Sequence, residues 1–485
     1  MNKPIRRVAI ACLLLFVILL VNDNVVQYAN AKTLRDKPGN TRLLFQQYDR
    51  KRGDIVTATG VTIASSVPTN DTLKYLRTYS NGPLFAPVTG FYSIVYNASQ
   101  IELAENSILA GTDDRLFGVQ QLSNLITGRT PEGGNVVLTI DPVLQQVAYT
   151  ALAGRKGAVV AVDPSTGAIL AMVTSPSYDP NVLSSHNTTS ITQDWQKLIA
   201  DQANNPMLDR ALSQTYPPGS TFKLITAAAA LSTGQYTPTT VIPAPAALPL
   251  PQSTSVLHNF QGESCGGQAT LIQALTISCN TAFGELGLTI GQSALQAQAD
   301  AFGFDSTYSV PMKSAQSVFP TDLSDANTIQ SAIGQYDVRA TPLQMAMVAA
   351  AIANGGVEMK PYLVDELVGP DLRIIDQTKP AVLRRAVSTQ VAAELTQMME
   401  SVVQHGTGTS AQIKGVTVAG KTGTAQNAVG AAPHAWFVAF APAVQPKIAI
   451  AVLVENGGGN SDATGGAIAA PIAKAVIAAE LKKQP

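Results

Sequence analysis

The sequence of 485 residues has little of what metal centres and disulfide-rich folds need. It contains 3 cysteines and 4 histidines, no C-x-x-C pair, and histidines that stand singly at His186, His258, His405 and His434. Metal-binding motifs bring several such ligands together at short, fixed spacings. We therefore expect no metal site, and the sequence contains nothing that requires a cofactor.

Charged residues are also scarce, and their signs are balanced. They make up 13% of the chain with a net charge of −1, whereas hydrophobic residues make up 46%. Nucleic-acid-binding domains carry a basic excess, and disordered chains are poor in apolar residues. The sequence thus predicts two or three folded domains and no nucleic-acid partner.

One apolar run near the N-terminus predicts where the chain is located. Basic residues in positions 3–7 precede the apolar run 8–21, which can continue to Tyr28. We expect residues 1–7 to be a cytoplasmic tip, residues 8–28 a signal anchor, and residues 32 onward to be exported under the positive-inside rule. Cleavage as a signal peptide stays open, because Ala29-Asn30-Ala31 resembles a cleavage site.

Export leaves Cys265 and Cys279 as the only cysteine pair outside the membrane. Disulfides persist in such compartments, so these two could be bonded. They could equally be two buried thiols that pack as small apolar side chains. The spacing does not decide between these alternatives.

The remainder divides at about residue 135. Residues 32–52 are basic and polar, and predict either a solvated juxtamembrane stalk or a face that meets anionic headgroups or an anionic wall polymer. Within 32–135 we expect a smaller, non-catalytic mixed domain with short strands at 55–57 and 91–96.

Beyond residue 135, strong patterns predict a helix capped by Asp141 and a hairpin over 157–173. Helices are expected at 222–231, 268–288, 341–354, 389–403 and 467–481, and strands at 416–421, 434–440 and 448–455. This order predicts an α+β domain in which one antiparallel sheet is covered by helices.

The stretch YPPGSTFKLI places a serine and a lysine on one expected helix. Ser220 follows a Pro-Pro-Gly turn, and Lys223 stands three positions later on the same helix face. The positive end of the helix dipole favours an oxyanion at the serine, and apolar neighbours favour the neutral, basic form of the lysine. The pair therefore predicts a nucleophile with its own base, although a plain helix cap would look alike when taken alone.

Two further motifs supply what a nucleophile needs. Ser278 and Asn280 lie two positions apart and can present a hydroxyl and an amide to one cleft. The segment Lys421-Thr422-Gly423-Thr424 follows an apolar strand and offers a cation, two hydroxyls and an open backbone edge for an extended peptide. Each motif alone occurs by chance, but the order S-x-x-K, S-x-N, K-T-G predicts an acyl-transfer site.

With these three motifs the sequence resembles the serine penicillin-recognising enzymes over roughly residues 136–485. The resemblance is carried by the segments LTIDPVLQ, VAVDPSTGAILAMVTSPSYDPN, GSTFKL, ISCN, TPLQMA and VAGKTGTAQ. The membrane anchor and Arg52-Gly53-x-Ile55 resemble class B penicillin-binding proteins, and the compact N-terminal region resembles their actinobacterial members. One departure is Tyr336, where many relatives have glycine, so we expect one loop near the site to have its own shape.

The resemblance implies a penicillin-binding transpeptidase fold over 136–485, with a five-stranded antiparallel sheet covered by helices on both faces. The N-terminal domain would be a pedestal or dimerisation domain. Ser220 would be the acylated nucleophile and Lys223 its base. Ser278 would relay a proton to the leaving group, and Asn280 would position the substrate amide.

The resemblance also implies how the substrate is held. Lys421, Thr422 and Thr424 would bind its carboxylate on the strand edge that Gly423 leaves open, and Lys421 would also polarise the S-x-N serine. The backbone N–H groups of Ser220 and Thr424 would form an oxyanion hole.

The family's substrate is the D-Ala-D-Ala end of peptidoglycan stem peptides, and its covalent inhibitors are β-lactam antibiotics. The implied activity is therefore a serine-type D,D-transpeptidase of cell-wall synthesis, cell shape and cell division. It would be single-pass in the plasma membrane, with its catalytic domain outside and with a membrane glycan polymerase and division proteins as partners.

Several alternatives share parts of this pattern. A class A β-lactamase needs an extra glutamate, but none lies between Glu285 and Glu358, and its chain lacks the extra N-terminal region. The segment 262–266 matches the G-x-S-x-G elbow of another hydrolase fold, but a polar, broken stretch precedes it, which predicts a loop. A D,D-carboxypeptidase, and a non-catalytic penicillin sensor or scaffold, stay open.

Overall fold

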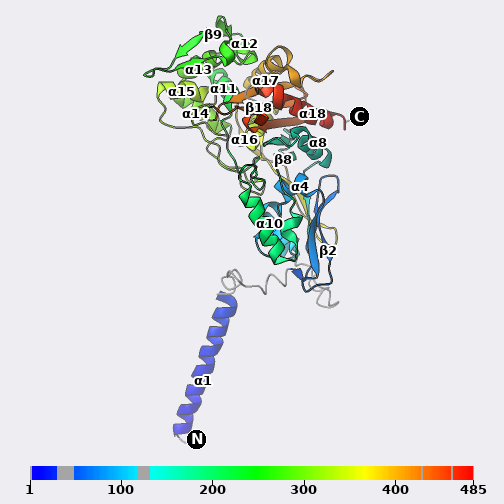
Figure 1. Cartoon of the computed structure of the whole chain (residues 1–485). Coiled ribbons are helices and arrows are strands. Elements are labelled where there is room, and N and C mark those ends of the chain that lie inside the picture. The colour runs from blue at the N-terminus through cyan, green and yellow to red at the C-terminus, as the bar shows by residue number, and fades with distance from the viewer. Residues whose placement is uncertain (1–2, 30–47, 117–131, 428–429, 460–462, 484–485) are drawn as a thin grey trace.

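Figure 1 shows the computed structural model, which describes residues 3–29, 48–116, 132–427, 430–459 and 463–483. The N-terminal helix α1 (Lys3–Asn24) continues as a π-helical turn (Val25–Ala29), and its described side chains are exposed throughout. Lys3–Tyr28 is the one helix among the described residues that is long and apolar enough to cross a membrane. Of the basic segment predicted at 32–52, residues 32–47 lie outside the described residues.

The central sheet has five antiparallel strands in the order β17-β18-β19-β7-β8. Their bounds are β7 Gly157–Val162, β8 Ile169–Ser175, β17 Ala419–Ala425, β18 His434–Ala441 and β19 Ile448–Val454. Every residue of β18 and β19 is buried. Strands covered on both faces consist of continuous apolar runs, which is why the sequence predicted them well.

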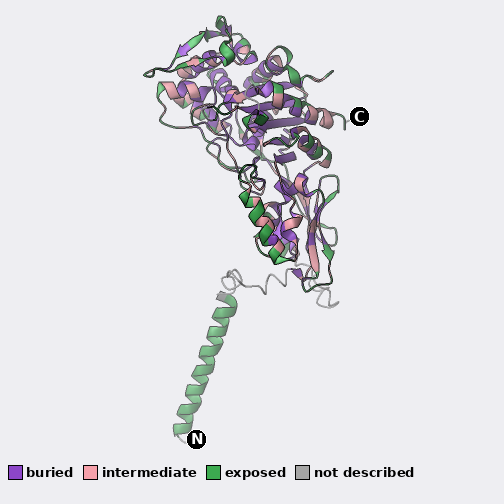
Figure 2. Ribbon diagram, in the orientation of Figure 1, coloured by how far each residue is buried: buried purple, intermediate pink, exposed green. Residues whose placement is uncertain are grey.

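Helices cover both faces of this sheet. Helix α16 (Pro342–Ala353) contacts β7, β18 and β19, and it is buried from Pro342 to Ile352 because its surface is apolar all round. Helices α8 (Pro142–Leu152) and α18 (Ala470–Leu481) pack against each other, α8 on β8 and α18 on β18 and β19. Figure 2 shows the buried strands between these layers. The predicted α+β fold is confirmed.

Some of the helices and strands predicted from local sequence patterns are confirmed, and others have different bounds. Asp141 caps α8 as predicted, accepting hydrogen bonds from the N–H groups of Val143 and Leu144. The single helix expected at 268–288 is wrong: strand β12 (Gly267–Thr270) is followed by α12 (Leu271–Thr276) and α13 (Asn280–Ile290). The helix breaks because Ser278 has a left-handed backbone, with φ of 61°. The strand expected at 416–421 begins later, so that the whole K-T-G-T segment lies within β17.

The middle of the chain is mainly helical, and forms one end of the molecule in Figure 1. Besides α12 and α13, its helices include α11 Lys223–Ser232, α14 Gln292–Ala301 and α15 Asp325–Ala332. Helix α17 (Thr389–His405), from later in the chain, packs against α11 and α12. Two small strand pairs flank them, β9 (Val241–Ala244) with β12 and β10 (Ala247–Pro249) with β11 (Val256–His258).

A second sheet joins the N-terminal region to the rest of the chain, in the order β15-β14-β6-β1-β2-β3. Its strands are β1 Ile55–Val56, β2 Thr62–Pro68, β3 Tyr75–Tyr79, β6 Asn135–Leu138, β14 Val364–Val368 and β15 Ile374–Gln377. The strand expected at 91–96 shrinks to β4 (Tyr92–Ser93). Strands β2 and β3 were missed because their polar residues weaken the apolar pattern.

A buried ion-pair network holds the N-terminal region together. Glu102 on α5 (Gln100–Ala104) is fully buried and accepts hydrogen bonds from Arg52 Nε at 2.6 Å, Arg77 Nε at 2.6 Å and the Tyr79 hydroxyl at 3.0 Å. Burial alone would raise the pKa of Glu102, but the charges of Arg52 and Arg77 hold it below its ordinary value. Arg52 also lies over the ring of Tyr92, 4.2 Å from its centroid. The network links β3, α5 and the segment before β1.

Replacing Glu102 with alanine should lower the free energy of unfolding by about 3–5 kcal/mol, because two arginine charges would stay buried without a partner. The matched control is Asp194→Ala, which breaks the exposed Lys197–Asp194 pair on α10 (Thr188–Ala200) and should cost less than about 1 kcal/mol. Urea unfolding of the purified protein measures both values. Similar losses in the two variants would contradict a stabilising role for the network.

Candidate active site

Ser220 lies in a tight turn that is pressed against strand β17. The 3-10 turn Gly219–Phe222 precedes α11, and Gly219 has a left-handed φ of 52°. A Cβ on Gly219 would lie 2.9 Å from the carbonyl oxygen of Thr424, so only glycine allows this close approach. Ser220 is half-buried, and its hydroxyl has no hydrogen bond to any described residue.

The residues before this turn fix it to the sheet. Pro217 O accepts a hydrogen bond from Trp436 Nε1 on β18 at 3.0 Å. The Tyr216 hydroxyl donates to Glu455 Oε1 at 2.7 Å, and the same oxygen accepts from Arg210 Nε at 2.7 Å. The residues just before the nucleophile turn are therefore fastened to β18 and to Glu455, which directly follows β19.

The S-x-N residues lie in the break between α12 and α13, and they hold the amine of Lys223. Lys223 Nζ lies 2.6 Å from Ser278 O, 2.8 Å from Asn280 Oδ1 and 3.3 Å from Ser278 Oγ. Within the described part of the chain, the amine makes no hydrogen bond to Ser220 Oγ. The sequence predicted that Ser220 and Lys223 share one helix face. Instead, Ser220 lies in the 3-10 turn, and Lys223 begins α11 with its amine directed to the S-x-N turn.

A second lysine reaches the same serine from the sheet. Lys421 Nζ on β17 lies 2.9 Å from Ser278 Oγ and 3.0 Å from Thr422 O. Ser278 Oγ is therefore the common partner of Lys223 and Lys421, and both lysine side chains are fully buried.

Both lysine amines have lowered pKa values because they are buried. Burial lowers the pKa of Lys223 well below its ordinary value, and the charge of Lys421 lowers this pKa further. Burial lowers the pKa of Lys421 to about 7. A neutral amine has two protons and one lone pair, so Lys223 can donate to Ser278 O and Asn280 Oδ1 and still accept a proton from a hydroxyl.

Strand β17 presents the K-T-G-T segment at the edge of the central sheet. A Cβ on Gly423 would lie 2.9 Å from Thr221 Cγ2 and 2.9 Å from Trp436 Cβ, which makes glycine necessary at the contact with the nucleophile turn. The hydroxyls of Thr422 and Thr407 are hydrogen bonded to each other. Thr407 was not predicted, because it follows α17 in a segment with no recognisable motif.

A cavity of about 260 Å³ opens onto the convergence of the three motifs. Its lining includes Ser220, Ser278, Asn280, Thr422 and Thr424, whereas both lysines lie buried behind it. An adjoining groove of about 980 Å³ shares three of these residues. The structure thus gathers the sequence-predicted site residues around one cavity, with the hydroxyl and amide side chains in its lining and the two lysines buried.

Tyr336 lines the larger groove and has a backbone conformation that favours glycine. Its backbone has a left-handed φ of 59°, and its side chain is 40% exposed. A left-handed backbone costs an L-residue with a Cβ roughly 1–2 kcal/mol, whereas glycine adopts it freely. The loop keeps a glycine-type conformation while it presents a tyrosine ring to the groove.

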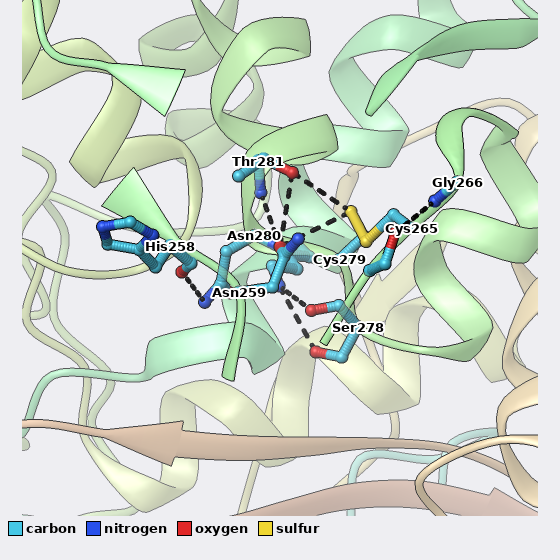
Figure 3. The surroundings of a disulfide bond; sticks show 10 residues. His258, Asn259, Cys265, Gly266, Ser278, Cys279, Asn280 and Thr281 are labelled. Carbon is cyan, nitrogen blue, oxygen red and sulfur yellow. Dashed lines mark hydrogen bonds between the residues drawn. A yellow bond between two sulfur atoms is a disulfide. The ribbon is translucent and has the colours of Figure 1, made fainter. Parts of the chain in front are cut away.

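Cys265 and Cys279 form a disulfide, which decides between the two alternatives that the sequence left open. Cys265 and Cys279 are bonded with their Cα atoms 6.3 Å apart. Cys279 is the middle residue of the S-x-N motif, so the bond ties that motif to the loop before β12 (Figure 3). The G-x-S-x-G match at 262–266 lies in this loop, with Ser264 exposed, and no buried strand precedes it.

Comparison with known families gives the class of this site. A family model of the penicillin binding protein transpeptidase domain matches residues 157–478. The chain belongs to the penicillin-binding protein transpeptidase family. A second model, of the penicillin binding protein A dimerisation domain, matches residues 52–136.

Similar proteins of this family match over nearly the whole chain. Peptidoglycan D,D-transpeptidase PbpA of Mycolicibacterium smegmatis is 50% identical, with all of both chains covered. The ceftriaxone acyl-enzyme of penicillin-binding protein A from Mycobacterium tuberculosis has a TM-score of 0.87 at 48% identity, over 90% of this chain and 100% of that one. The penicillin G acyl-enzyme of that protein has a TM-score of 0.85 at 49% identity, over 89% and 100%. The predicted resemblance to actinobacterial class B penicillin-binding proteins is confirmed. Within that class, the chain is similar to penicillin-binding protein A.

Proposed function

We propose that this transpeptidase cross-links peptidoglycan stem peptides through an acyl-enzyme on Ser220, and that β-lactams acylate the same serine. The observation that carries the proposal is the contact of two buried lysine amines with Ser278 Oγ, beside a serine hydroxyl that is open to the cavity. This arrangement supplies a base, a proton relay and a cation without histidine or metal ligands.

Acylation follows from the protonation states of the two amines. Ser220 Oγ attacks the carbonyl carbon of the penultimate D-Ala, and its proton passes to neutral Lys223. The C–N bond to the terminal D-Ala then breaks, and Ser278 passes its proton to the leaving nitrogen and takes up the proton held by Lys223, which becomes neutral again. The amine of a second stem peptide attacks the carbonyl carbon of the resulting ester, and the C–O bond to Ser220 breaks as the new amide forms. The attacking nitrogen gives up one proton, which passes through Lys223 to Ser220 Oγ and restores the hydroxyl.

The strand edge and the neighbouring backbone orient the substrate in this scheme. Lys421, Thr422 and Thr424 bind the carboxylate of the terminal D-Ala, with Gly423 allowing close approach to β17, while Asn280 holds the substrate amide. The N–H groups of Ser220 and Thr424 stabilise the oxyanion. The tight packing of Gly219 against the Thr424 carbonyl supports this, because it brings the two backbone segments together.

We also propose the division of the chain and its location. Residues 8–28 would be an uncleaved anchor with a cytoplasmic tip at 1–7, residues 32–135 a non-catalytic domain, and residues 136–485 the extracytoplasmic transpeptidase domain. The exposed apolar helix with basic residues at its start supports the orientation, and the disulfide suits an oxidising compartment. A membrane glycan polymerase and division proteins are the expected partners.

Labelling with fluorescent penicillin tests the nucleophile. Ser220→Ala should abolish covalent labelling, and Lys223→Ala or Lys421→Ala should slow it about 10²-fold or more, as the loss of a base or a charge clamp does. Ser264→Ala is the matched control, because this serine belongs to the competing G-x-S-x-G match near the same cleft. Labelling that survives in Ser220→Ala, or is lost in Ser264→Ala, would overturn the assignment.

A product assay separates transpeptidase from the alternatives. The full-length protein in detergent is given glycan strands with D-Ala-D-Ala stem peptides that carry acceptor amines. Release of D-Ala should be matched by cross-linked dimers, because the amine attacks the acyl-enzyme. Tetrapeptide monomers alone would indicate a D,D-carboxypeptidase. Penicillin labelling without any D-Ala release would indicate a sensor or a scaffold.

A further inference from the structure

The segment 256–266, here called the strap, runs along the S-x-N turn and is fastened to it at several points (Figure 3). His258 O accepts a hydrogen bond from Asn280 Nδ2 at 3.1 Å. Cys265 is bonded to Cys279. Between these points, the side chain of Asn259 reaches the start of α13 and also lines the cavity beside Ser220.

Asn259 serves as the cap of a helix that begins 21 residues later. Its Oδ1 accepts hydrogen bonds from the N–H of Asn280 at 2.8 Å, the N–H of Thr281 at 3.0 Å and the Thr281 hydroxyl at 3.3 Å. The residue at the N-cap position of α13 is Cys279, and its side chain makes no capping bond. The first N–H groups of a helix need an outside acceptor, and the strap supplies it.

The surroundings of Asn259 leave its amide group one orientation. The residue is 6% exposed, and Oδ1 must face the two N–H donors. Its Nδ2 is then buried with no hydrogen-bond partner among the described residues. An unpaired buried amide N–H destabilises the fold, so the capping contact is kept in spite of this cost.

The start of α13, which Asn259 caps, also holds the amine of Lys223. Asn280 is the first residue of α13, and Ser278 directly precedes the cap position with a left-handed backbone. The Lys223 amine is bound by Asn280 Oδ1 and Ser278 O. A shift in the first turn of α13 would therefore move two acceptors of the base.

We propose that Asn259 is a positioning residue for acylation, which fixes the S-x-N turn and thereby the amine of Lys223 toward Ser220. The inference rests on the proposed function, in which Lys223 is the base. If the Lys223 amine is misaligned, acylation within the bound complex should slow more than penicillin binding weakens.

The test compares Asn259→Ala with a matched cap variant in the full-length protein. Asn187→Ala removes another asparagine cap, since Asn187 Oδ1 accepts from Ser190 N at 3.1 Å on α10 and is not among the residues lining the cavity. Stopped-flow labelling with fluorescent penicillin gives the dissociation constant and the acylation rate constant separately. Asn259→Ala should lower the rate constant at least about tenfold with a smaller change in binding. Asn187→Ala should leave both unchanged.

A double-mutant cycle with Lys223→Ala shows whether Asn259 acts through the base. In the Lys223→Ala background, Asn259→Ala should cause little further loss, because the group that it positions is absent. Asn259→Ser, whose shorter side chain is the milder change, takes the place of the alanine variant if that variant does not fold. Wild-type acylation by the Asn259 variants, equal slowing by Asn187→Ala, or full additivity with Lys223→Ala would overturn the inference. Failure of the wild-type protein to label at all would overturn the proposed function instead.

Discussion

Two buried lysine amines meet at one serine hydroxyl, and the chemistry of the site depends on how their charge is divided. Within the described residues no carboxylate forms an ion pair with Lys223 or Lys421. Two ammonium groups in such a place would be poorly solvated and would repel each other. The lower pKa of Lys223 resolves this conflict, because it leaves one amine basic while the other keeps a charge for an anionic substrate. The role of base would not be available to a solvated lysine at neutral pH, since its ordinary pKa is far higher and its amine stays protonated.

The fold brings the two amines together by close packing of backbone segments from distant parts of the sequence. Gly219 and Gly423 allow the nucleophile turn and the edge strand to touch, and in both places a Cβ would collide with the neighbouring segment. Tyr216 and Trp436 fasten that turn to the sheet from the other side. The S-x-N turn has a strained residue at Ser278 and depends on the strap for its cap and its disulfide. A preorganised site of this kind needs little rearrangement when substrate charge develops.

The sequence predicted those parts of the molecule that have local patterns. The buried strands 157–162, 434–441 and 448–454 are apolar runs, and the three motifs are short and contiguous, so both were found. The split between α12 and α13 was not found, because it depends on one serine with a left-handed backbone in a stretch of helix-forming residues. Asn259 and Thr407 were missed for another reason: each acts through a partner more than ten residues away and belongs to no motif. The disulfide could not be decided, since spacing gives no Cα geometry.

The pH dependence of acylation is the most direct test of the division of charge. The second-order rate constant for penicillin labelling reports the ionisations of the free protein. With a pKa of about 7, Lys421 is charged below that pH and loses its charge above it, so the rate should fall above about pH 7. In Lys421→Arg the cation persists, and this fall should disappear below about pH 9 even if the absolute rate is lower. A wild-type rate that stays constant up to pH 9, or a fall near pH 7 that persists in Lys421→Arg, would contradict the account.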